Sequence, residues 1–155
     1  MQTRLVTLRE RPALGPQVAA WLWHAFWREN GESLETVLAV VGRSDAERGP
    51  QQSFVLLEDG APAGTASLAA ADLDERPALT PWLAGVFVRP ESRGRGHGAQ
   101  LVQAVERAAA EGGAATLWLY TGGEGALYRR LGWEAVERVP QDSRTVLLMR
   151  KALGG

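Results

Sequence analysis

The segment from residue 86 to residue 98 combines residue types that bind phosphate groups. It reads Val-Phe-Val-Arg-Pro-Glu-Ser-Arg-Gly-Arg-Gly-His-Gly, so three glycines stand at alternate positions directly before an apolar helical pattern. Glycine leaves the main chain uncovered, and successive N–H groups at a helix start can close on an anion. The segment therefore predicts a pyrophosphate-binding turn. A glycine-rich turn needed only for tight packing has the same pattern, so the glycines alone leave both interpretations open.

Two common phosphate-binding motifs do not match this segment. No Gly-Lys-Ser/Thr follows, which excludes a Walker loop, and the spacing GxGxG differs from the dinucleotide fingerprint GxGxxG. A glycine-loop binder of ATP or NAD is kept as an alternative that ligand affinities would test.

The composition excludes several kinds of chemistry. With 17 Lys plus Arg against 18 Asp plus Glu, the formal net charge is -1. Nucleic acid is therefore not expected as a partner, because its phosphates favour clustered positive charge. The sequence has no cysteine, which excludes disulfides, thiolate nucleophiles and sulfur-ligated metals. His24 and His97 lack the spacing of metal ligands, so we expect no metal site. The only lysine, Lys151, lies near the C-terminal end, and a Schiff-base mechanism is discarded.

The hydrophobic pattern predicts an alternating series of strands and helices in one domain spanning residues 1–155. The 45% of apolar residues is enough for a core of its own. Expected strands cover residues 5–8, 54–58, 62–68, 82–88, 116–121, 133–139 and 145–149. Expected helices cover residues 16–30, 33–42, 96–112 and 125–131. No apolar run approaches the ~18 residues of a membrane span, so a cytoplasmic protein is expected.

Two of these predictions fix the fold class. The order strand, helix and strand over residues 82–121 predicts a right-handed parallel crossover, and Asp59-Gly60 predicts a tight hairpin. The result is an α/β domain with a mixed sheet. On the first helix, the 3.6-residue period places Val18, Trp21, Leu22, Ala25 and Phe26 toward the core.

Two segments resemble the GNAT superfamily of acyl-CoA-dependent N-acetyltransferases. Residues 93–98, Arg-Gly-Arg-Gly-His-Gly, are similar to that family's signature Arg/Gln-x-x-Gly-x-Gly/Ala. Residues 126–133, Ala-Leu-Tyr-Arg-Arg-Leu-Gly-Trp, are similar to its tyrosine-containing segment. The resemblance implies an α/β (α+β) fold with a mixed, mostly antiparallel sheet, a parallel crossover at the cofactor site and helices on both faces. It also implies acetyl-CoA as co-substrate.

The resemblance assigns the cofactor-binding residues. Main-chain groups of Val86 and Val88 would pair with the pantetheine amides as an added strand does. The amides of Gly94, Arg95, Gly96, His97, Gly98 and Ala99 would hold the pyrophosphate. Arg93 would support the loop or a phosphate, and Arg95 would face solvent or the nucleotide phosphates. For His97, a backbone N–H is the preferred contribution over its imidazole.

The resemblance also assigns catalytic residues, with two departures from the family. Tyr128 would donate to the departing thiolate, unless it is only a core aromatic. The glutamate base of several members has no equivalent in residues 82–88, and Thr121 stands where many members have asparagine. A carboxylate or an ordered water must then take the amine proton. Asp72 is the first choice, before Asp74 and Glu124, although solvated loop acids fit equally well.

The acceptor is expected to be an amine. Trp23 and Trp27 form a second apolar ridge that would contact substrate, contact a second subunit or extend the core. Asp74 and Glu124, with Asp72, predict a cationic small molecule or a peptide amine. Without a cysteine, attack within a ternary complex is expected. The alternative is an acyl-CoA sensor without turnover, and both a monomer and a homodimer are open.

Overall fold

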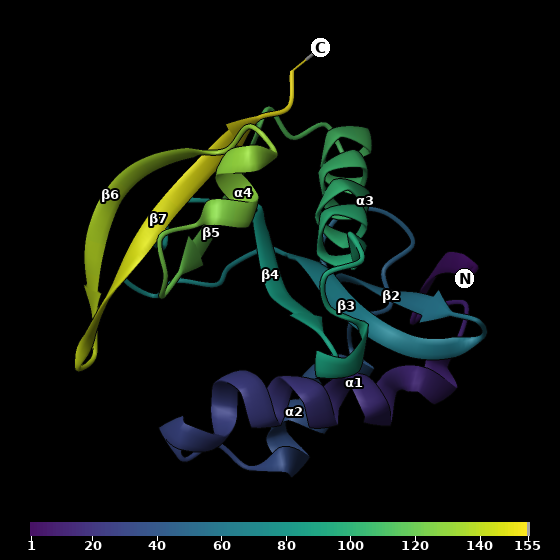
Figure 1. Cartoon of the computed structure of the whole chain (residues 1–155). Coiled ribbons are helices and arrows are strands. Elements are labelled where there is room, and N and C mark those ends of the chain that lie inside the picture. The colour runs from purple at the N-terminus through teal and green to yellow at the C-terminus, as the bar shows by residue number, and fades with distance from the viewer. Residues whose placement is uncertain (155) are drawn as a thin grey trace.

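A computed structural model describes residues 1–154. The seven strands of these residues form one mixed sheet in the order β1-β2-β3-β4-β5-β7-β6, which confirms the predicted fold class (Figure 1). The strands are β1 (Thr3–Thr7), β2 (Gln52–Glu58), β3 (Ala61–Ala69), β4 (Trp82–Val88), β5 (Thr116–Thr121), β6 (Glu134–Gln141) and β7 (Arg144–Ala152). The helices are α1 (Gly15–Leu22), α2 (Leu34–Gly42), α3 (His97–Glu111) and α4 (Ala126–Arg130). None of them is long and apolar enough to cross a membrane.

The strand directions follow from the connections. β2 and β3 are antiparallel and joined by Asp59 and Gly60, whose φ angles of 51° and 86° are those of the predicted tight hairpin. β4, α3 and β5 form the predicted crossover, and β4 and β5 are the parallel pair in the sheet. The remaining neighbours are antiparallel.

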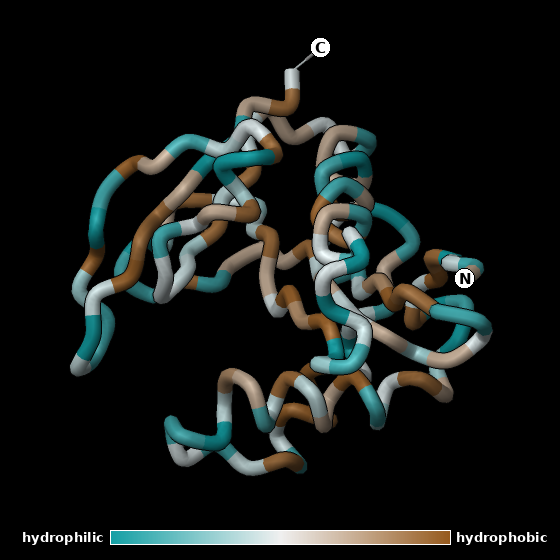
Figure 2. Tube along the Cα trace, in the orientation of Figure 1, coloured by the Kyte–Doolittle hydropathy of each residue, from teal (hydrophilic) through white to brown (hydrophobic). Residues whose placement is uncertain are grey.

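Helices cover both faces of the sheet. On one face, α3 buries Leu101 and Val105 in a core that also takes in side chains of α4. On the other face, α1 and α2 bury Val18 and Val37 against Val55 of β2. Figure 2 shows hydrophobic residues along the central strands and these helices, whereas the tip of the β6–β7 hairpin is hydrophilic. The core thus lies in two layers on either side of β2 to β5.

The first helix ends earlier than its hydrophobic pattern predicts. α1 stops at Leu22, and Trp23–Trp27 form a π-helical turn that leads into a 3-10 turn, Arg28–Asn30. A π turn holds more residues than an α turn, so later side chains rotate off the 3.6-residue stripe. The prediction that Ala25 and Phe26 face the core is therefore wrong. Both are exposed, Phe26 by 46%.

Candidate functional site

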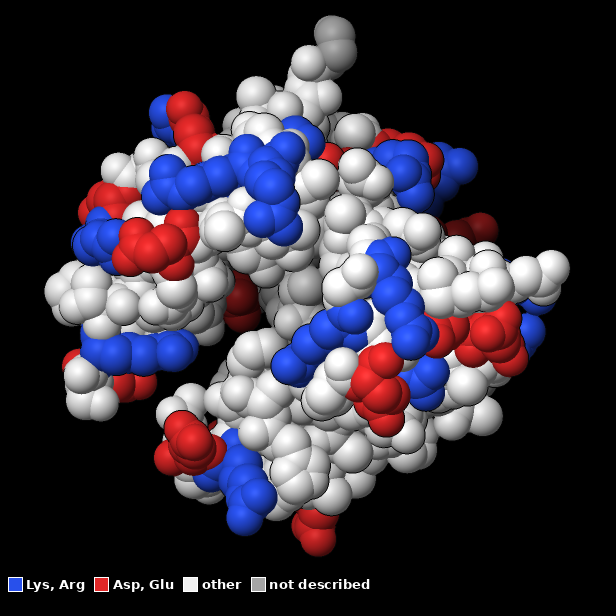
Figure 3. Space-filling model, in the orientation of Figure 1, with Lys and Arg blue, Asp and Glu red and all other residues white. Residues whose placement is uncertain are grey.

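β4 and β5 separate soon after they begin. In the described residues their parallel pairing is limited to Trp82 and Trp118, whereas β3 stays paired with β4 as far as Val88. The two halves of the sheet therefore diverge along β4, as Figure 1 shows. The space-filling view shows a hollow between the two lobes, with acidic atoms at its back (Figure 3). This opening exposes one edge of β4.

Main-chain groups of Val88 face the opening. The Arg89 N–H donates to the Ala63 carbonyl of β3 at 2.8 Å. Because residues of a strand alternate in the neighbour they bond, Val88 turns its polar groups away from β3. Arg93 Nε donates to the Val88 carbonyl at 2.8 Å. Val86 lies where the register with β3 shifts, and the pairing of Val86 and Val88 with an extended ligand stays a prediction.

A bulge bends β4 beside this edge. The register shift places Gly85 and Val86 together opposite Ala66 of β3. Gly85 has a φ of +62°, and a methyl group on it would come within 3.1 Å of Leu22 Cδ2. Glycine is therefore favoured by the backbone angle, and a larger residue would also crowd Leu22 at the end of α1.

The turn before α3 is open to a ligand at its glycines. Gly94 and Gly96 have φ angles of +79° and +80°. A methyl group on either would meet no atom within 4 Å. The space beside the main chain is therefore free, and the residues present fit a phosphate or pyrophosphate group.

The first turn of α3 supplies main-chain donors next to these glycines. The Gln100 N–H closes the first ring of the helix on the Gly96 carbonyl at 3.2 Å. The N–H groups of His97, Gly98 and Ala99 precede that ring, so they lack helical partners. A methyl group on Gly98 would lie 3.3 Å from a side chain of α4, so this glycine also serves packing.

Two arginines of the turn engage protein groups. Arg93 donates to β4, and its guanidinium lies 5.7 Å from the Phe87 ring centre, as a cation–π contact. Arg93 therefore supports the loop, one of its two predicted roles. Arg95 pairs with Glu58 while its side chain stays 45% exposed.

Glu58, the last residue of β2, lies beneath the turn, and no sequence pattern singles it out. It is 8% exposed. One carboxylate oxygen lies 2.6 Å from His97 Nε2, and the other pairs with Arg95 and lies 3.9 Å from Arg89 Nη2. The His97 hydrogen bond above all, and then Arg95, lower the pKa of Glu58 to about 2 against the opposing effect of burial. The imidazole of His97 is thus a buried structural group.

Tyr128 lies on α4, on the same face of the sheet as α3. The helix begins after Gly125, where a methyl group would come within 2.6 Å of Met149 Sδ. The Tyr128 ring is half-buried and edge-on to Trp133, with 6.2 Å between ring centres. Burial raises the pKa of the Tyr128 phenol above its usual value of 10. Tyr128 therefore keeps its proton at neutral pH.

A network around the lysine holds the end of α4. Lys151 Nζ lies 2.8 Å from Glu106 Oε1 and donates to the Leu131 carbonyl at 2.7 Å. The other oxygen of Glu106 accepts from Trp133 Nε1 at 3.0 Å. α3, β7 and the segment after α4 are joined by these contacts, which fix the helix that carries Tyr128.

Asp72 lies on the opposite face, beyond the end of β3. Burial chiefly, and then the charge of Asp74, raise the pKa of Asp72 to about 7. Burial and the Asp72 charge also raise the pKa of Tyr120, a residue of β5 that sequence patterns did not indicate. The Tyr120 ring is edge-on to Trp82, with 6.3 Å between ring centres. Asp72 therefore lies near the point where β4 and β5 diverge.

The other predicted acids differ from Asp72. Asp74 is exposed. Glu124 is 76% exposed and pairs with Arg138 of β6 at 2.9 Å, so its charge is compensated. Arg144 also lies near this side, because it counteracts the rise in the Tyr120 pKa. The part of the opening beside Asp72, where the acceptor is expected, is thus less acidic than the sequence suggests.

The two tryptophans of the π turn have different surroundings. Trp23 is half-buried, its Nε1 donates to the Glu32 carbonyl at 2.7 Å, and Arg28 lies 5.6 Å from its ring centre. Trp27 is 42% exposed. Trp23 is therefore tied into the helical layer, while Trp27 offers an accessible indole.

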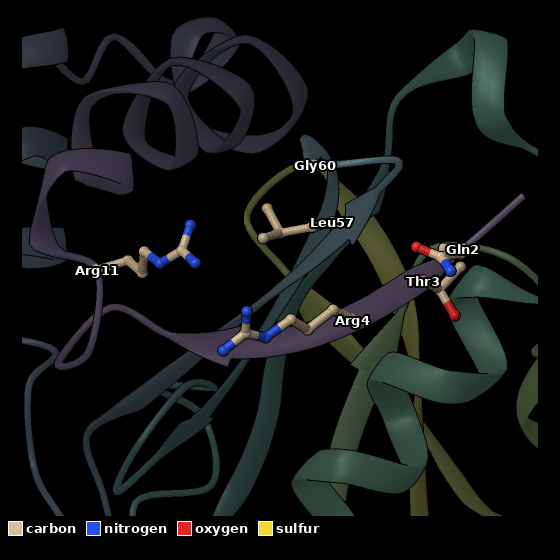
Figure 4. Close-up of a pocket in the computed structure, with 6 residues that line it drawn as sticks. All are labelled: Gln2, Thr3, Arg4, Arg11, Leu57 and Gly60. Atoms are coloured by element: carbon tan, nitrogen blue, oxygen red, sulfur yellow. The ribbon is translucent and has the colours of Figure 1, made fainter.

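A separate hollow of about 620 Å³ lies at the β1 edge. Figure 4 shows the Arg4 and Arg11 side chains extending toward one another across it. β2 and β3 lie between β1 and β4 in the sheet, so this hollow is not part of the opening.

Comparisons with known proteins agree with this arrangement. The model of the acetyltransferase (GNAT) family matches residues 16–133. An aminoglycoside 6'-acetyltransferase type Ii is similar, with a TM-score of 0.75, 18% identity and coverage of 100% of this chain and 99% of that one. The structure of yncA from Salmonella typhimurium with its cofactor acetyl-CoA has a TM-score of 0.72, 19% identity and coverage of 100% and 95%. A ribosomal-protein-alanine N-acetyltransferase from Brucella melitensis has a TM-score of 0.72, 23% identity and coverage of 98% and 99%.

These solved structures share the fold with the chain, and no curated protein sequence matches it significantly. The family match spans the opening, the glycine turn and Tyr128. The chain belongs to the GNAT family of acetyltransferases.

Proposed function

We propose that this protein is an N-acetyltransferase that transfers the acetyl group of acetyl-CoA to an amine within a ternary complex. One observation carries the proposal. The opening along β4 leads to the glycine turn, and two desolvated groups able to transfer protons, Asp72 and Tyr128, lie on opposite faces of the sheet beside it. A thioester entering from one face can then meet an amine from the other.

The chain binds the co-substrate mainly through its backbone. The open side of Gly94 and Gly96 and the N–H groups of residues 97–99 hold the pyrophosphate. Val86 and Val88 bind the pantetheine arm along the free edge of β4. Acetyl-CoA supplies an activated acetyl thioester when bound.

Asp72 accepts the proton of the attacking amine. With a pKa of about 7, its carboxyl is partly ionised at neutral pH, the condition that suits a general base. Removal of that proton leaves the amine lone pair free to attack the thioester carbonyl.

Tyr128 donates to the departing sulfur. Its phenol stays protonated because burial raises its pKa. Negative charge grows on sulfur as the carbon–sulfur bond breaks, and a hydrogen bond from the phenol stabilises that charge without a full proton transfer.

The acceptor is a cationic amine on a small molecule or peptide. Asp72 and Asp74 provide the negative charge at the opening, since Glu124 is paired with Arg138. Two of the similar proteins named above are an aminoglycoside 6'-acetyltransferase and a ribosomal-protein-alanine N-acetyltransferase, whose acceptors carry amines. A single domain over residues 1–155, a monomeric or homodimeric state and a cytoplasmic location stay predictions.

The co-substrate site is tested with Gly96→Asn. Asparagine tolerates a φ near +80° better than other side chains, so this variant fills the open space with little backbone strain. Calorimetry should show at least tenfold weaker CoA binding. Gly113→Asn is the matched control, because Gly113 has a φ of +89° and equally open space beyond the end of α3. Equal CoA affinity in Gly96→Asn and wild type would contradict the assigned site.

The reaction is tested by thiol release from acetyl-CoA with a panel of amines. Release with cationic amines, and little with glutamate, supports the proposal. CoA binding without release on any amine would favour the sensor, and tight ATP or NAD binding without CoA binding would favour the nucleotide binder.

A further inference from the structure

Glu58 gathers the charged side chains of the glycine turn at one buried point. His97 Nε2 lies 2.6 Å from one of its oxygens, and Arg95 pairs with the other. Arg89 Nη2 approaches to 3.9 Å and its Nε donates to the buried Ser92 at 2.7 Å. These contacts join the end of β2 to three positions of a distant segment, of which Arg95 and His97 are 37 and 39 residues away in sequence.

The contacts of Arg95 and His97 with Glu58 lie on either side of Gly96 and so restrain the backbone of the turn. Arg95 and His97 flank Gly96, which has a φ of +80°. Because Glu58 binds both flanking side chains, they lie on the β2 side of the turn. A methyl group on Gly94 or Gly96 would meet no atom within 4 Å. The turn is thus anchored through Arg95 and His97, while the space beside its two glycines is open.

We propose that Glu58 is a positioning residue that holds the turn in its anion-binding form through Arg95 and His97. This proposal rests on the acetyl-CoA-binding function proposed above. Glu58 does not touch the co-substrate. Its carboxylate sets the conformation of Gly94 and Gly96, and thereby the direction of the N–H groups that do.

Such anchoring has a physical purpose, because glycine-rich segments lose the most conformational freedom when they are ordered. A turn that is already ordered before binding loses less when the ligand arrives, so its affinity is higher. The buried site, 8% exposed at Glu58 and 1% at His97, keeps water from competing for these bonds. Removal of the carboxylate should therefore weaken binding of acetyl-CoA and leave the chemical step intact.

The test compares Glu58→Ala, Glu58→Gln and Arg95→Ala with wild type. The KM for acetyl-CoA is expected to rise about tenfold in Glu58→Ala, with kcat within about twofold. Glu58→Gln, which can still bond Arg95, should recover part of the loss. The double variant Glu58→Ala/Arg95→Ala should have a KM for acetyl-CoA no higher than that of Glu58→Ala, because the Arg95–Glu58 pair is already lost in the single variant.

Val55→Ala is the matched control for stability. Val55 lies in the same strand with its side chain in the core under α1 and α2, so its truncation destabilises the protein without reaching the turn. Its KM should match that of wild type. Hydrogen exchange of residues 93–100, without ligand, should speed up in Glu58→Ala and not in Val55→Ala.

The outcomes separate this proposal from the proposed function. Wild type that fails to bind CoA would overturn the function. Wild type that binds CoA, together with an unchanged KM in both Glu58→Ala and Arg95→Ala, would overturn the positioning role alone. If Glu58→Ala does not fold, Arg95→Ala decides by hydrogen exchange without ligand: residues 93–100 must exchange faster than in wild type, and unchanged exchange would overturn the positioning role.

Discussion

Glu58 ends the first strand of the β2–β3 hairpin and Asp72 follows the second, and the protein shifts the pKa values of these two carboxyl groups in opposite directions. Contacts with His97 and Arg95 lower the pKa of Glu58 to about 2, while burial beside Asp74 raises that of Asp72 to about 7. The difference lies in the partners. A carboxylate surrounded by donors stays ionised and holds structure, whereas one deprived of donors becomes able to exchange a proton near neutral pH.

The same difference separates the two sides of the opening. On the cofactor side, polar groups are bonded to one another, and ligand recognition is left to the main chain of the turn. On the acceptor side, the proposed base Asp72 is surrounded by low-dielectric protein and the like charge of Asp74, whereas Tyr128, on the face that carries α3, is affected by burial alone. The following experiments test whether anchoring and reactivity are divided in this way.

The largest expected effect is that of Asp72→Asn on turnover. Loss of a general base lowers kcat/KM by about a hundred- to a thousandfold at pH 7. In wild type, kcat/KM should rise with pH through about 7 as Asp72 loses its proton, and this rise should be absent in the variant. Steady-state kinetics from pH 6 to 9 measure both. Asp74→Asn, at an exposed neighbouring acid, should keep the wild-type rise with a slightly lower midpoint, since its charge adds to the Asp72 shift. Parental kinetics in Asp72→Asn would remove it from the mechanism.

Tyr128→Phe should lower kcat by about a hundredfold, because the hydroxyl stabilises charge that develops on sulfur. The ring contact with Trp133 is kept, so the KM for acetyl-CoA and the unfolding midpoint should hardly change. If kcat in the variant equals that of wild type, Tyr128 is a packing residue and the proposed stabilisation of the departing sulfur is wrong.

Stability should respond to pH with opposite signs at the two carboxylates. Protonated Asp72 favours the folded state below its unfolded pKa of 3.8, and this contribution is lost as pH rises through about 7. Asp72→Asn should therefore be more stable than wild type at pH 8, by at most about 4 kcal/mol, with no gain below pH 4.

Ionised Glu58 contributes above its unfolded pKa of 4.5, and its contribution is lost as pH falls toward about 2. Glu58→Gln should therefore be less stable than wild type at pH 7, and the deficit should shrink toward pH 2. Urea unfolding from pH 3 to pH 8 gives both profiles. Parallel profiles for the two variants would contradict the opposite pKa shifts.

The smallest expected effect is that of Trp27→Ala. Its indole is exposed, and if it contacts the acceptor, one of its predicted roles, the acceptor KM should rise about threefold, a value typical of a partly exposed contact. The KM for acetyl-CoA should stay the same. If the KM for acetyl-CoA rises instead, the π turn affects the binding of acetyl-CoA.

The cofactor side could be predicted from sequence because its information is local. Three glycines, a strand before them and a helix after them lie within one segment, and main-chain donors need no particular side chain. The Asp59-Gly60 hairpin and the parallel crossover were predictable for the same reason, since each depends on neighbouring residues.

The acceptor side and the anchor depend on contacts between distant segments. Glu58 and His97 are 39 positions apart, and a glutamate at a strand end has many other uses. Tyr120 becomes notable only when the fold brings it to Asp72. The π turn was missed because the apolar pattern of residues 18–26 fits an ordinary helix as well, so the pattern does not show where α1 ends.

The network at Lys151 bears on how this protein would tolerate acetyl-CoA, the co-substrate proposed for it. Acetyl-CoA modifies exposed lysine amines without any enzyme, in proportion to how much free amine they present. Of the 17 basic residues in this sequence, Lys151 is the only lysine, and its Nζ is bonded to Glu106 and to the Leu131 carbonyl. A guanidinium is always protonated and a poor nucleophile. A surface whose basic residues are arginines therefore offers almost no side-chain amine for acetylation. The one lysine that could react is hydrogen-bonded to Glu106 and to the segment after α4, the helix that carries Tyr128.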